Sequence, residues 1–344
     1  MSSFNYSLPN IDGHSGRLEA HLTGLKGKRV YFDPLRGNRG DELIVLGIRE
    51  LLVRQEVTLC NSIDEADHVL IKGGGAFLDT YESLLNYISE LFESCQNKPV
   101  TLMPTSFGLS RRSLEDIVGP RDLPVQVFVR ERASLEILQA RTKSPQFSYA
   151  LEHDTAFYLL GSKFLSQQIR KRSPKHILVV ERQDAESLDT TNMGVQKTQQ
   201  GHETAGSYLR VAASSMVPDS IKVTGRRLRN LKKIEDTNRQ TPFAKLASDF
   251  LVSRHPEHSG TPVRFLDASD NTYSTFPQFV SIIRDASIVL TTRLHVGILS
   301  AMLGIPTYLV PGVYHKLSGI HSLSMNTWPH VTLLPRSFAA GQSP

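Results

Sequence analysis

The sequence predicts an α/β protein made of two Rossmann-like domains that face one another across a cleft. Short apolar runs alternate with amphipathic segments of helical period, in two separate series. This alternation is typical of parallel sheets covered by helices on both faces. Because 344 residues are long for one core, two domains are expected. We place a polar lead-in at residues 1–27, the N-terminal domain at 28–165 and the C-terminal domain at 175–335.

The first series alternates strands and helices along the N-terminal domain. Its apolar runs are short enough for buried strands, and one helix shows Leu43, Leu46 and Leu51 at helical spacing. The expected strands are Arg29–Asp33, Val57–Cys60, His68–Ile71, Val100–Met103 and Val125–Val129. The expected helices are Ser15–Leu25, Glu42–Arg54, Tyr81–Ser94 and Ala133–Ala140.

The second series begins after a polar stretch at residues 160–175, which marks the domain boundary. Residues 184–243 are polar and broken by Gly and Pro, so most of them receive no assignment, and the tail after Leu334 is expected to be loose. The expected strands are His176–Val180, Val263–Leu266, Ile288–Leu290 and Pro306–Val310. The expected helices are Ala244–Arg254, Phe276–Asp285 and Val296–Leu303.

Composition restricts the class of protein and its setting. The 39 basic and 34 acidic residues give a net charge of +5, which suits anionic substrates but does not indicate a nucleic-acid partner. Cys60 and Cys95 lack CxxC spacing and nearby His ligands, so neither a disulfide framework nor a zinc site is expected. No signal-peptide core is present, and no run approaches the roughly 18 apolar residues of a membrane span. We therefore expect a cytoplasmic protein that requires no metal.

The segment Ile288–Leu323 carries the most specific functional signal. One expected strand ends just before Arg293 and His295, and the next is followed by His315 and Lys316. Ligands of open α/β sheets bind outside the carboxyl ends of the strands. Arginine supplies a permanent charge there, and histidine supplies a proton near neutral pH. The pattern predicts a site for a small anion beside a proton donor or acceptor.

Two further arginines follow strands in the same manner. Arg130 closes the strand Val125–Val129, and Arg182 follows the first strand of the C-terminal domain. An arginine in such a position can hold a carboxylate or a phosphate through two parallel hydrogen bonds. An ordinary surface charge is the alternative at both positions.

Two glycine-containing loops follow strands of the N-terminal domain. The loop GNRGD includes Asn38 and Asp41, which could line a ligand at a helix N-terminus, or Asp41 could simply cap that helix. The run Gly73, Gly74 and Gly75 predicts close approach of an acceptor sugar, a phosphate or the facing domain, with a tight strand-to-helix turn as the alternative. Neither loop carries GxGxxG or GK[ST], so a dinucleotide fingerprint and a P-loop are not supported.

The chain resembles the polysaccharide pyruvyl transferase family in blocks that cover most of its length in order. These blocks are GNRGDELI at 37–44, VLIKGGGAFLD at 69–79, VRERASLEIL at 129–138, EHDTAF at 152–157 and IVLTTRLHVGILSAMLGIPTYLVPGVYHKLSGI at 288–320. The resemblance implies a fold similar to that of GT-B glycosyltransferases. It also implies that a pyruvyl group moves from phosphoenolpyruvate, a co-substrate, onto a sugar as a ketal, with release of phosphate.

The resemblance also implies roles for individual residues. Arg293 and His295 match the donor-contacting RLH motif and are expected to be catalytic, with His295 as the general acid or base. Arg182 and Arg130 match two further arginines of the family. The expected donor set is Arg293, His295, Arg182, Arg130, Lys316 and His315, and the expected acceptor or cleft loops hold Asn38, Asp41, Gly73, Gly74 and Gly75.

Other functions remain as alternatives. A nucleotide-sugar glycosyltransferase on the same fold is the first, and a non-catalytic glycan-binding relative is the second. An NAD oxidoreductase is disfavoured because the glycine fingerprint is absent. The basic run at 226–233 is typical of a solvated face, and attraction to a lipid-linked acceptor at the inner face of the membrane is its alternative interpretation. Galactose, glucose, mannose and N-acetylated sugars all fit as acceptors.

Overall fold

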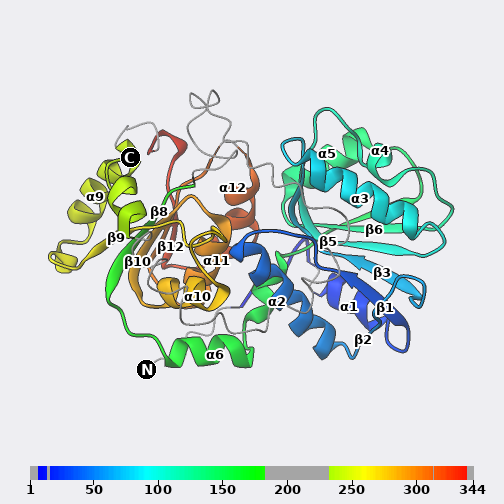
Figure 1. Cartoon of the computed structure of the whole chain (residues 1–344), viewed down its shortest axis with the longest axis horizontal. Helices are drawn as coiled ribbons and strands as arrows, with labels where there is room; N and C mark the ends of the chain where they lie inside the picture. Colours follow the sequence, from blue (N-terminus) through cyan, green and yellow to red (C-terminus); the bar gives the residue numbers. More distant parts are fainter. Residues whose placement is uncertain (1–6, 14–15, 183–231, 313, 339–344) are drawn as a thin grey trace.

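The computed structural model describes residues 7–13, 16–182, 232–312 and 314–338, and these residues form two parallel β-sheets. Within the described residues, one sheet has seven strands in the order β2-β1-β3-β5-β6-β7, with β4 beside β5. The other has five, in the order β12-β11-β10-β8-β9. Figure 1 shows the sheets side by side, with α2 (Arg39–Arg54) between them. The predicted α/β class with parallel sheets is confirmed.

The first sheet and its helices come from the N-terminal half of the chain. Its strands are β1 (Arg29–Asp33), β2 (Thr58–Leu59), β3 (His68–Ile71), β4 (Gly74–Leu78), β5 (Val100–Gly108), β6 (Val125–Val129) and β7 (Phe147–Leu151). Its helices, besides α2, are α1 (Arg17–Thr23), α3 (Glu82–Ser94), α4 (Leu114–Val118) and α5 (Arg132–Arg141). Parallel registers such as Val125 with Phe147 place the carboxyl ends of the strands along one edge.

The second sheet follows a connection that contains the 3₁₀ turn η1 (Thr155–Leu159) and α6 (Lys163–Arg170). Its strands are β8 (His176–Val180), β9 (Val263–Phe265), β10 (Ala286–Thr291), β11 (Thr307–Leu309) and β12 (Val331–Leu333). Its helices are α9 (Pro242–Arg254), α10 (Phe276–Arg284), α11 (Leu294–Met302) and α12 (Lys316–Ile320). The remaining turns are η5 (Pro256–His258), η6 (His321–Met325) and η7 (Arg336–Phe338).

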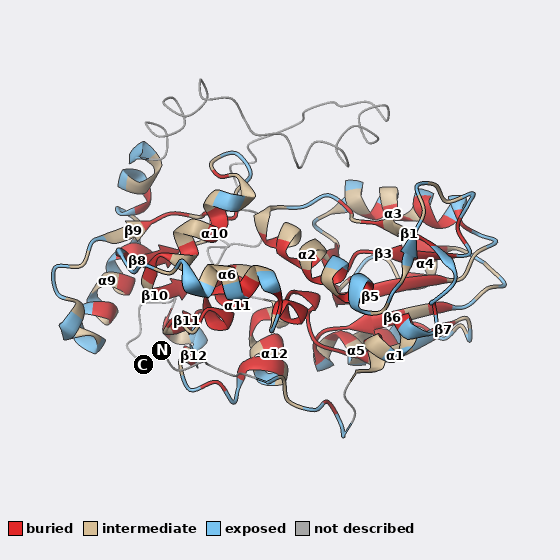
Figure 2. Cartoon of the chain, turned by 90° about the horizontal axis from the view of Figure 1, so that it is seen from below, coloured by how far each residue is buried: buried red, intermediate tan, exposed pale blue. Residues whose placement is uncertain are grey.

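Burial explains why continuous apolar runs form these strands. Every residue of β3 and of β8 is buried, as expected where helices cover both faces of a parallel sheet. Figure 2 shows buried residues on the strands and exposed residues on the outer faces of helices such as α6. Helices packed against both faces of each sheet therefore bury the apolar side chains of the strands.

Helix α2 joins the layers of the two sheets. Its side chain Leu43 belongs to the same apolar cluster as Phe157 of η1 and Leu299 of α11. A Cβ on Gly47 would lie 2.0 Å from the carbonyl oxygen of Thr155, so the helix can cross η1 this closely only at a glycine. This crossing fixes the start of α2, and the residues after β7, against the second sheet.

The glycine run was expected in a loop, and that expectation is wrong for part of it. Gly74 and Gly75 begin β4, which pairs in parallel with β5. A Cβ on Gly73 would lie 2.0 Å from the carbonyl oxygen of Pro104, so the backbones approach too closely for a side chain. Because glycines carry no apolar pattern, the strand was not predicted.

Several other elements differ from expectation. The tail after Leu334 is not loose throughout, because η7 buries Phe338 completely. Residues 184–231 lie outside the described part of the chain, and so does most of the basic run at 226–233, whereas residues 232–238 are helical. Within the described ranges, no helix is both long and apolar enough to cross a bilayer. The unexpected elements are β4, β7, β12, α4, α6 and α12.

Candidate functional site

Polar side chains from both sheets meet beside the first turn of α2. Asp154 follows β7 of the first sheet, and His295 lies in the first turn of α11, after β10 of the second. His295 Nε2 is 3.4 Å from Asp154 Oδ2. A Cβ on Gly40 would lie 2.8 Å from both Cβ and Nδ1 of His295, so the imidazole rests against bare backbone. The carboxyl ends of both sheets and the N-terminus of α2 therefore converge here.

Asp154 and Arg130 form a buried ion pair at the centre of this region. Each side chain is 1% exposed, and Arg130 Nη1 lies 2.5 Å from Asp154 Oδ2. Arg130 Nε also donates to Ser106 Oγ at 2.9 Å. Burial by itself raises the pKa of Asp154, but Arg130 and then His295 outweigh burial and hold that pKa well below its ordinary value. The carboxylate is therefore ionised and held in place.

A second ion pair joins the glycine loops. Lys72, which follows β3, is 2% exposed, and its Nζ lies 3.2 Å from Asp41 Oδ1. The Asp41 carboxylate also accepts from the backbone amide of Asn38, while the Asn38 side chain accepts from the amide of Gly40. Asn38 and Asp41 thus form a capping box for α2. Burial raises the pKa of Asp41, but Lys72 and His295 lower it more, and the net pKa lies below its ordinary value. Asp41 thus caps the helix and also faces the site.

Two cations approach one point beside β4. A Cβ on Gly75 would lie 3.6 Å from Lys316 Nζ and 3.9 Å from Arg130 Nη2. Lys316 comes from the second sheet, at the start of α12, and Arg130 comes from the end of β6. Two cationic groups from different halves of the chain therefore lie close to Gly75, an arrangement that suits an anionic ligand.

His315 and Glu131 lie next to these cations. His315 Nε2 is 3.4 Å from Glu131 Oε1, and the Glu131 side chain is fully buried. Glu131 Oε2 accepts from Ser106 Oγ at 3.0 Å, and Ser106 Oγ is the same atom that accepts from Arg130 Nε. A continuous polar chain thus links His315 to Arg130.

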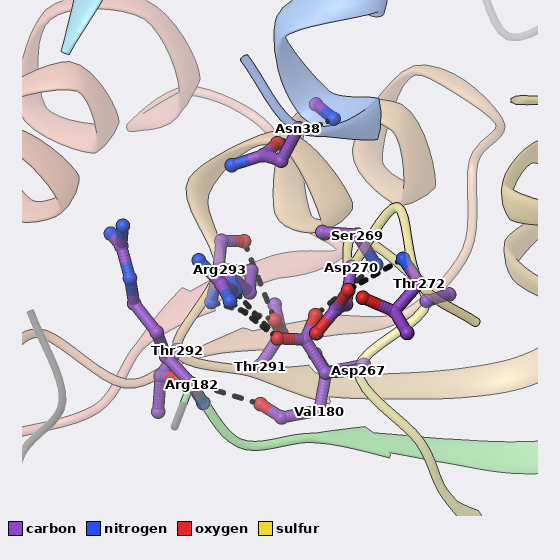
Figure 3. A network of polar contacts seen from close by, with 12 residues as sticks. Asn38, Val180, Arg182, Asp267, Ser269, Asp270, Thr272, Thr291, Thr292 and Arg293 are labelled. Carbon is purple, nitrogen blue, oxygen red and sulfur yellow. Dashed lines mark hydrogen bonds and ion pairs between the residues drawn. The ribbon is translucent and has the colours of Figure 1, made fainter. Parts of the chain in front are cut away.

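Arg293 and Arg182 belong to an adjacent network, shown in Figure 3. Arg293 is 8% exposed, and its Nε donates to Asp267 Oδ2 at 2.9 Å. The backbone amide of Arg182 donates to Thr292 Oγ1 at 2.7 Å, and its Nη2 donates to the hydroxyl of Tyr81 at 3.2 Å. Arg293 therefore carries a carboxylate counter-ion, and Arg182 reaches across to the start of α3.

The expected site residues thus divide into groups. Arg130 and His295 contact the Asp154 carboxylate. Lys316 and Arg130 approach Gly75, and Asp41 pairs with Lys72 and interacts with the charge of His295. Arg293 and Arg182 lie in the neighbouring network, and His315 lies beside Glu131. Asn38 serves as the N-cap of α2, and Gly73 and Gly74 lie against the backbone of β5 and the side chain of Ile44. The residues that the sequence did not single out are Asp154, Lys72, Glu131 and Asp267.

The missed residues had recognisable signals. Asp154 lies inside EHDTAF, two residues before a buried Ala156, and Lys72 stands between an apolar strand and the glycine run. A charged residue flanked by buried apolar segments is seldom buried itself unless it is paired. Among the described residues, no group of three or more His, Cys, Asp or Glu is arranged to hold a metal ion.

The fold and the site define an α/β protein whose cationic, carboxylate and imidazole groups gather at the carboxyl ends of two parallel sheets. A sequence model of the family described as polysaccharide pyruvyl transferase matches residues 38–311, and the chain belongs to that family. The predicted resemblance is confirmed. Membership indicates a transferase that moves a pyruvyl group to a glycan.

Solved structures provide a further comparison. An uncharacterized protein of Klebsiella pneumoniae subsp. pneumoniae NTUH-K2044 is 16% identical, with a TM-score of 0.53 over 92% of this chain and 96% of that chain. It shares the fold. A UDP-GlcNAc 2-epimerase of Methanocaldococcus jannaschii is 10% identical, with a TM-score of 0.34 over 88% of this chain and 73% of that one. No curated protein sequence matches this chain.

Proposed function

We propose that the protein transfers the enolpyruvyl group of phosphoenolpyruvate onto two hydroxyls of a sugar, forming a pyruvate ketal and releasing phosphate. The observation that carries this proposal is the approach of Arg130 and Lys316 to Gly75, together with the contact of Arg130 and His295 with the same Asp154 carboxylate. Phosphoenolpyruvate carries a phosphate and a carboxylate, so it needs at least two cations. The family of the chain supplies the reaction class.

The chemistry requires one proton to be gained at carbon and two to be lost from hydroxyls. C3 of the enolpyruvyl group takes a proton, and the first sugar hydroxyl adds to C2 and loses its proton. The C2–O bond to phosphate then breaks, and the second hydroxyl adds to C2 and loses its proton to close the ketal. Phosphate carries away the remaining proton. A positioned histidine contributes about 10²–10⁴-fold to such transfers, and His295 is assigned this role.

The other polar groups are assigned by position. Arg130 and Lys316 bind the donor anion, with His315 beside them. Arg293 and Arg182 form the far wall of the donor site, where Asp267 holds the guanidinium of Arg293. Asp41 offers a carboxylate to sugar hydroxyls at the start of α2. No metal cofactor is needed, because the developing charges are met by these side chains.

The proposed acceptor is a sugar of a polysaccharide or of its lipid-linked precursor. A peripheral position at the inner face of the membrane would bring a soluble enzyme to a lipid-linked acceptor. The partly exposed Asp41 carboxylate supports a polar, multi-hydroxyl acceptor without selecting one sugar.

Donor binding is tested by thermal unfolding with phosphoenolpyruvate, using UDP, GDP and NAD as comparison ligands. A ligand at 100 times its Kd stabilises the folded state by about 2.7 kcal/mol. We expect phosphoenolpyruvate alone to raise the Tm, and Lys316→Ala to abolish the rise. Lys171→Ala, which removes an exposed lysine at the C-cap of α6, is the matched control. A rise with UDP or GDP instead would contradict the proposal and favour a nucleotide-sugar enzyme.

Turnover is tested by phosphate release from phosphoenolpyruvate with a panel of hexosides. The product should gain the mass of pyruvate less one water, and it should lose that mass on mild acid treatment, as a ketal does. Binding of sugars without phosphate release from any member of the panel would favour the non-catalytic alternative.

A further inference from the structure

One ring nitrogen of His295 faces a carboxylate of the protein. Its Nε2 atom is buried and makes no well-aligned hydrogen bond to the described residues. The acceptor that faces it is Asp154 Oδ2, at 3.4 Å. Catalytic hydrogen bonds are often long in ligand-free structures and shorten when substrate binds. A buried N–H is costly to leave without an acceptor, so this pairing decides which nitrogen carries the proton.

The Asp154 carboxylate is held too firmly to turn away from the imidazole. Its Oδ1 accepts from the backbone amide of Ala156 at 2.8 Å, and its Oδ2 pairs with Arg130 Nη1 at 2.5 Å. Both contacts fix the carboxylate plane on a rigid turn, since η1 is crossed by α2 at Gly47. The anion thus presents a fixed acceptor to Nε2.

The other ring nitrogen lies on the side of α2. Nδ1 is 2.8 Å from the place where a Gly40 side chain would begin, and it makes no hydrogen bond to the described residues. The His295 side chain is 12% exposed although its Nε2 is buried, so the exposed part of the ring lies away from that nitrogen. Asp41, which pairs with Lys72, is the charged neighbour of His295 on the side of α2. On the opposite side, Asp154 lies between His295 and the guanidinium of Arg130.

We propose that Asp154 is a positioning residue that fixes neutral His295 with its proton on Nε2, so that Nδ1 is the atom that exchanges protons with the reactants. The statement about the reaction rests on the proposed function. Imidazolium gives its Nδ1 proton to C3 of the enolpyruvyl group and becomes the Nε2–H form. Nδ1 then takes a proton from a sugar hydroxyl as its oxygen bonds to C2, which restores the imidazolium.

The assignment is tested first on the wild-type protein without substrate. In protein labelled with ¹⁵N-histidine, ring nitrogen–proton correlation spectra distinguish the two neutral tautomers, and the signals lost in His295→Gln belong to His295. We expect Nε2 to carry the proton and Nδ1 to be unprotonated at a pH where the ring is neutral. A neutral ring with its proton on Nδ1 overturns the proposal, and this measurement needs no variant of Asp154.

The second test replaces the carboxylate. In Asp154→Asn, an amide N–H can face Nε2, so we expect the Nδ1–H tautomer to appear and kcat to fall about 10²–10⁴-fold, with KM for phosphoenolpyruvate changed only a few-fold. Asp285→Asn is the matched control, because Asp285 is also largely buried and ion-paired, with Lys175 and Arg284, away from the site. An unchanged His295 spectrum in folded Asp154→Asn contradicts the proposal.

The two proposals fail in different ways. If phosphoenolpyruvate neither binds nor turns over but the spectra show Asp154-dependent Nε2–H, the reaction is wrong and the positioning role stands. If turnover is intact in Asp154→Asn, the positioning role is wrong and pyruvyl transfer stands.

Discussion

The ammonium of Lys72 lies 3.2 Å from the carboxylate of Asp41, and the two partners differ sharply in exposure. The Lys72 side chain is 2% exposed, whereas that of Asp41 is 22% exposed. The pair links the end of β3 to the capping box of α2. Removing Asp41 should therefore lower the stability of the fold by a different amount than removing Lys72.

Replacing Asp41 by Asn should destabilise the fold more than replacing Lys72 by Met. Asn keeps the helix cap but leaves a buried ammonium unpaired, at a cost of about 3–5 kcal/mol. Lys72→Met leaves a carboxylate that retains water and the amide of Asn38. Urea unfolding of both single variants and the double variant measures the coupling, and the double should lose less than the sum. Strict additivity would show that the ion pair contributes nothing.

Gly40→Ala should disable proton transfer while the protein remains folded. The new Cβ would lie 2.8 Å from Cβ and Nδ1 of His295, so the imidazole must shift. A shift of roughly 1 Å in a reacting group can cost about 10²-fold in rate. We expect kcat to fall by that order, measured by phosphate release. Wild-type kcat in a folded Gly40→Ala protein would contradict the placement of His295.

Gly75→Ala should weaken donor binding instead. Its Cβ would make ordinary contacts with Lys316 Nζ at 3.6 Å and Arg130 Nη2 at 3.9 Å, so the fold should tolerate it. The methyl group would lie beside both cationic groups and would crowd an anion bound between them. We expect the Kd for phosphoenolpyruvate, from a thermal-shift titration, to rise about 10-fold, or about 1.4 kcal/mol. Gly40→Ala is its control, because that change should affect kcat more than Kd.

Some strands could be predicted from the sequence and others could not. The strands His68–Ile71, Val125–Val129 and His176–Val180 were predicted with their observed bounds, because each is a buried apolar run between polar residues. Strand β4 was missed because close backbone contact, and not side-chain pattern, selects its glycines.

The residues of the candidate site also divide into those that the sequence predicted and those that it missed. Arg130 and Lys316 were predicted as site residues because each follows a strand. Asp154 and Lys72 were not, because their importance depends on partners from distant segments. The pairing of Asp154 with His295 joins residues 141 positions apart in the sequence (295 − 154). Because the two residues follow strands of different sheets, their contact depends on how the sheets pack together. The spacing of residues along the sequence does not specify that packing.

Arg293→Ala should lower stability more than Lys316→Ala does. Arg293 is largely buried, and its guanidinium holds Asp267, which would be left without this partner. Truncating one side of a buried pair costs about 3–5 kcal/mol. Urea unfolding compares the two variants. If Arg293→Ala keeps wild-type stability yet loses the phosphoenolpyruvate shift, Arg293 is a donor contact and not chiefly a structural partner of Asp267.

The protein should lose stability as the pH falls from about 7 to 4, and His68 should contribute a measurable part of the loss. Burial, followed by the charges of His21 and Lys28, lowers the pKa of His68 from 6.5 to about 4. Between these values the unfolded chain binds a proton that the folded chain does not, so acid favours unfolding. One such group costs about 2 kcal/mol between pH 7 and pH 5. His68→Gln, which can still meet the Thr101 hydroxyl, should flatten this pH dependence in urea unfolding, while His258→Gln at a partly exposed position should not. Equal slopes in wild type and His68→Gln would show that folding does not shift the pKa of His68.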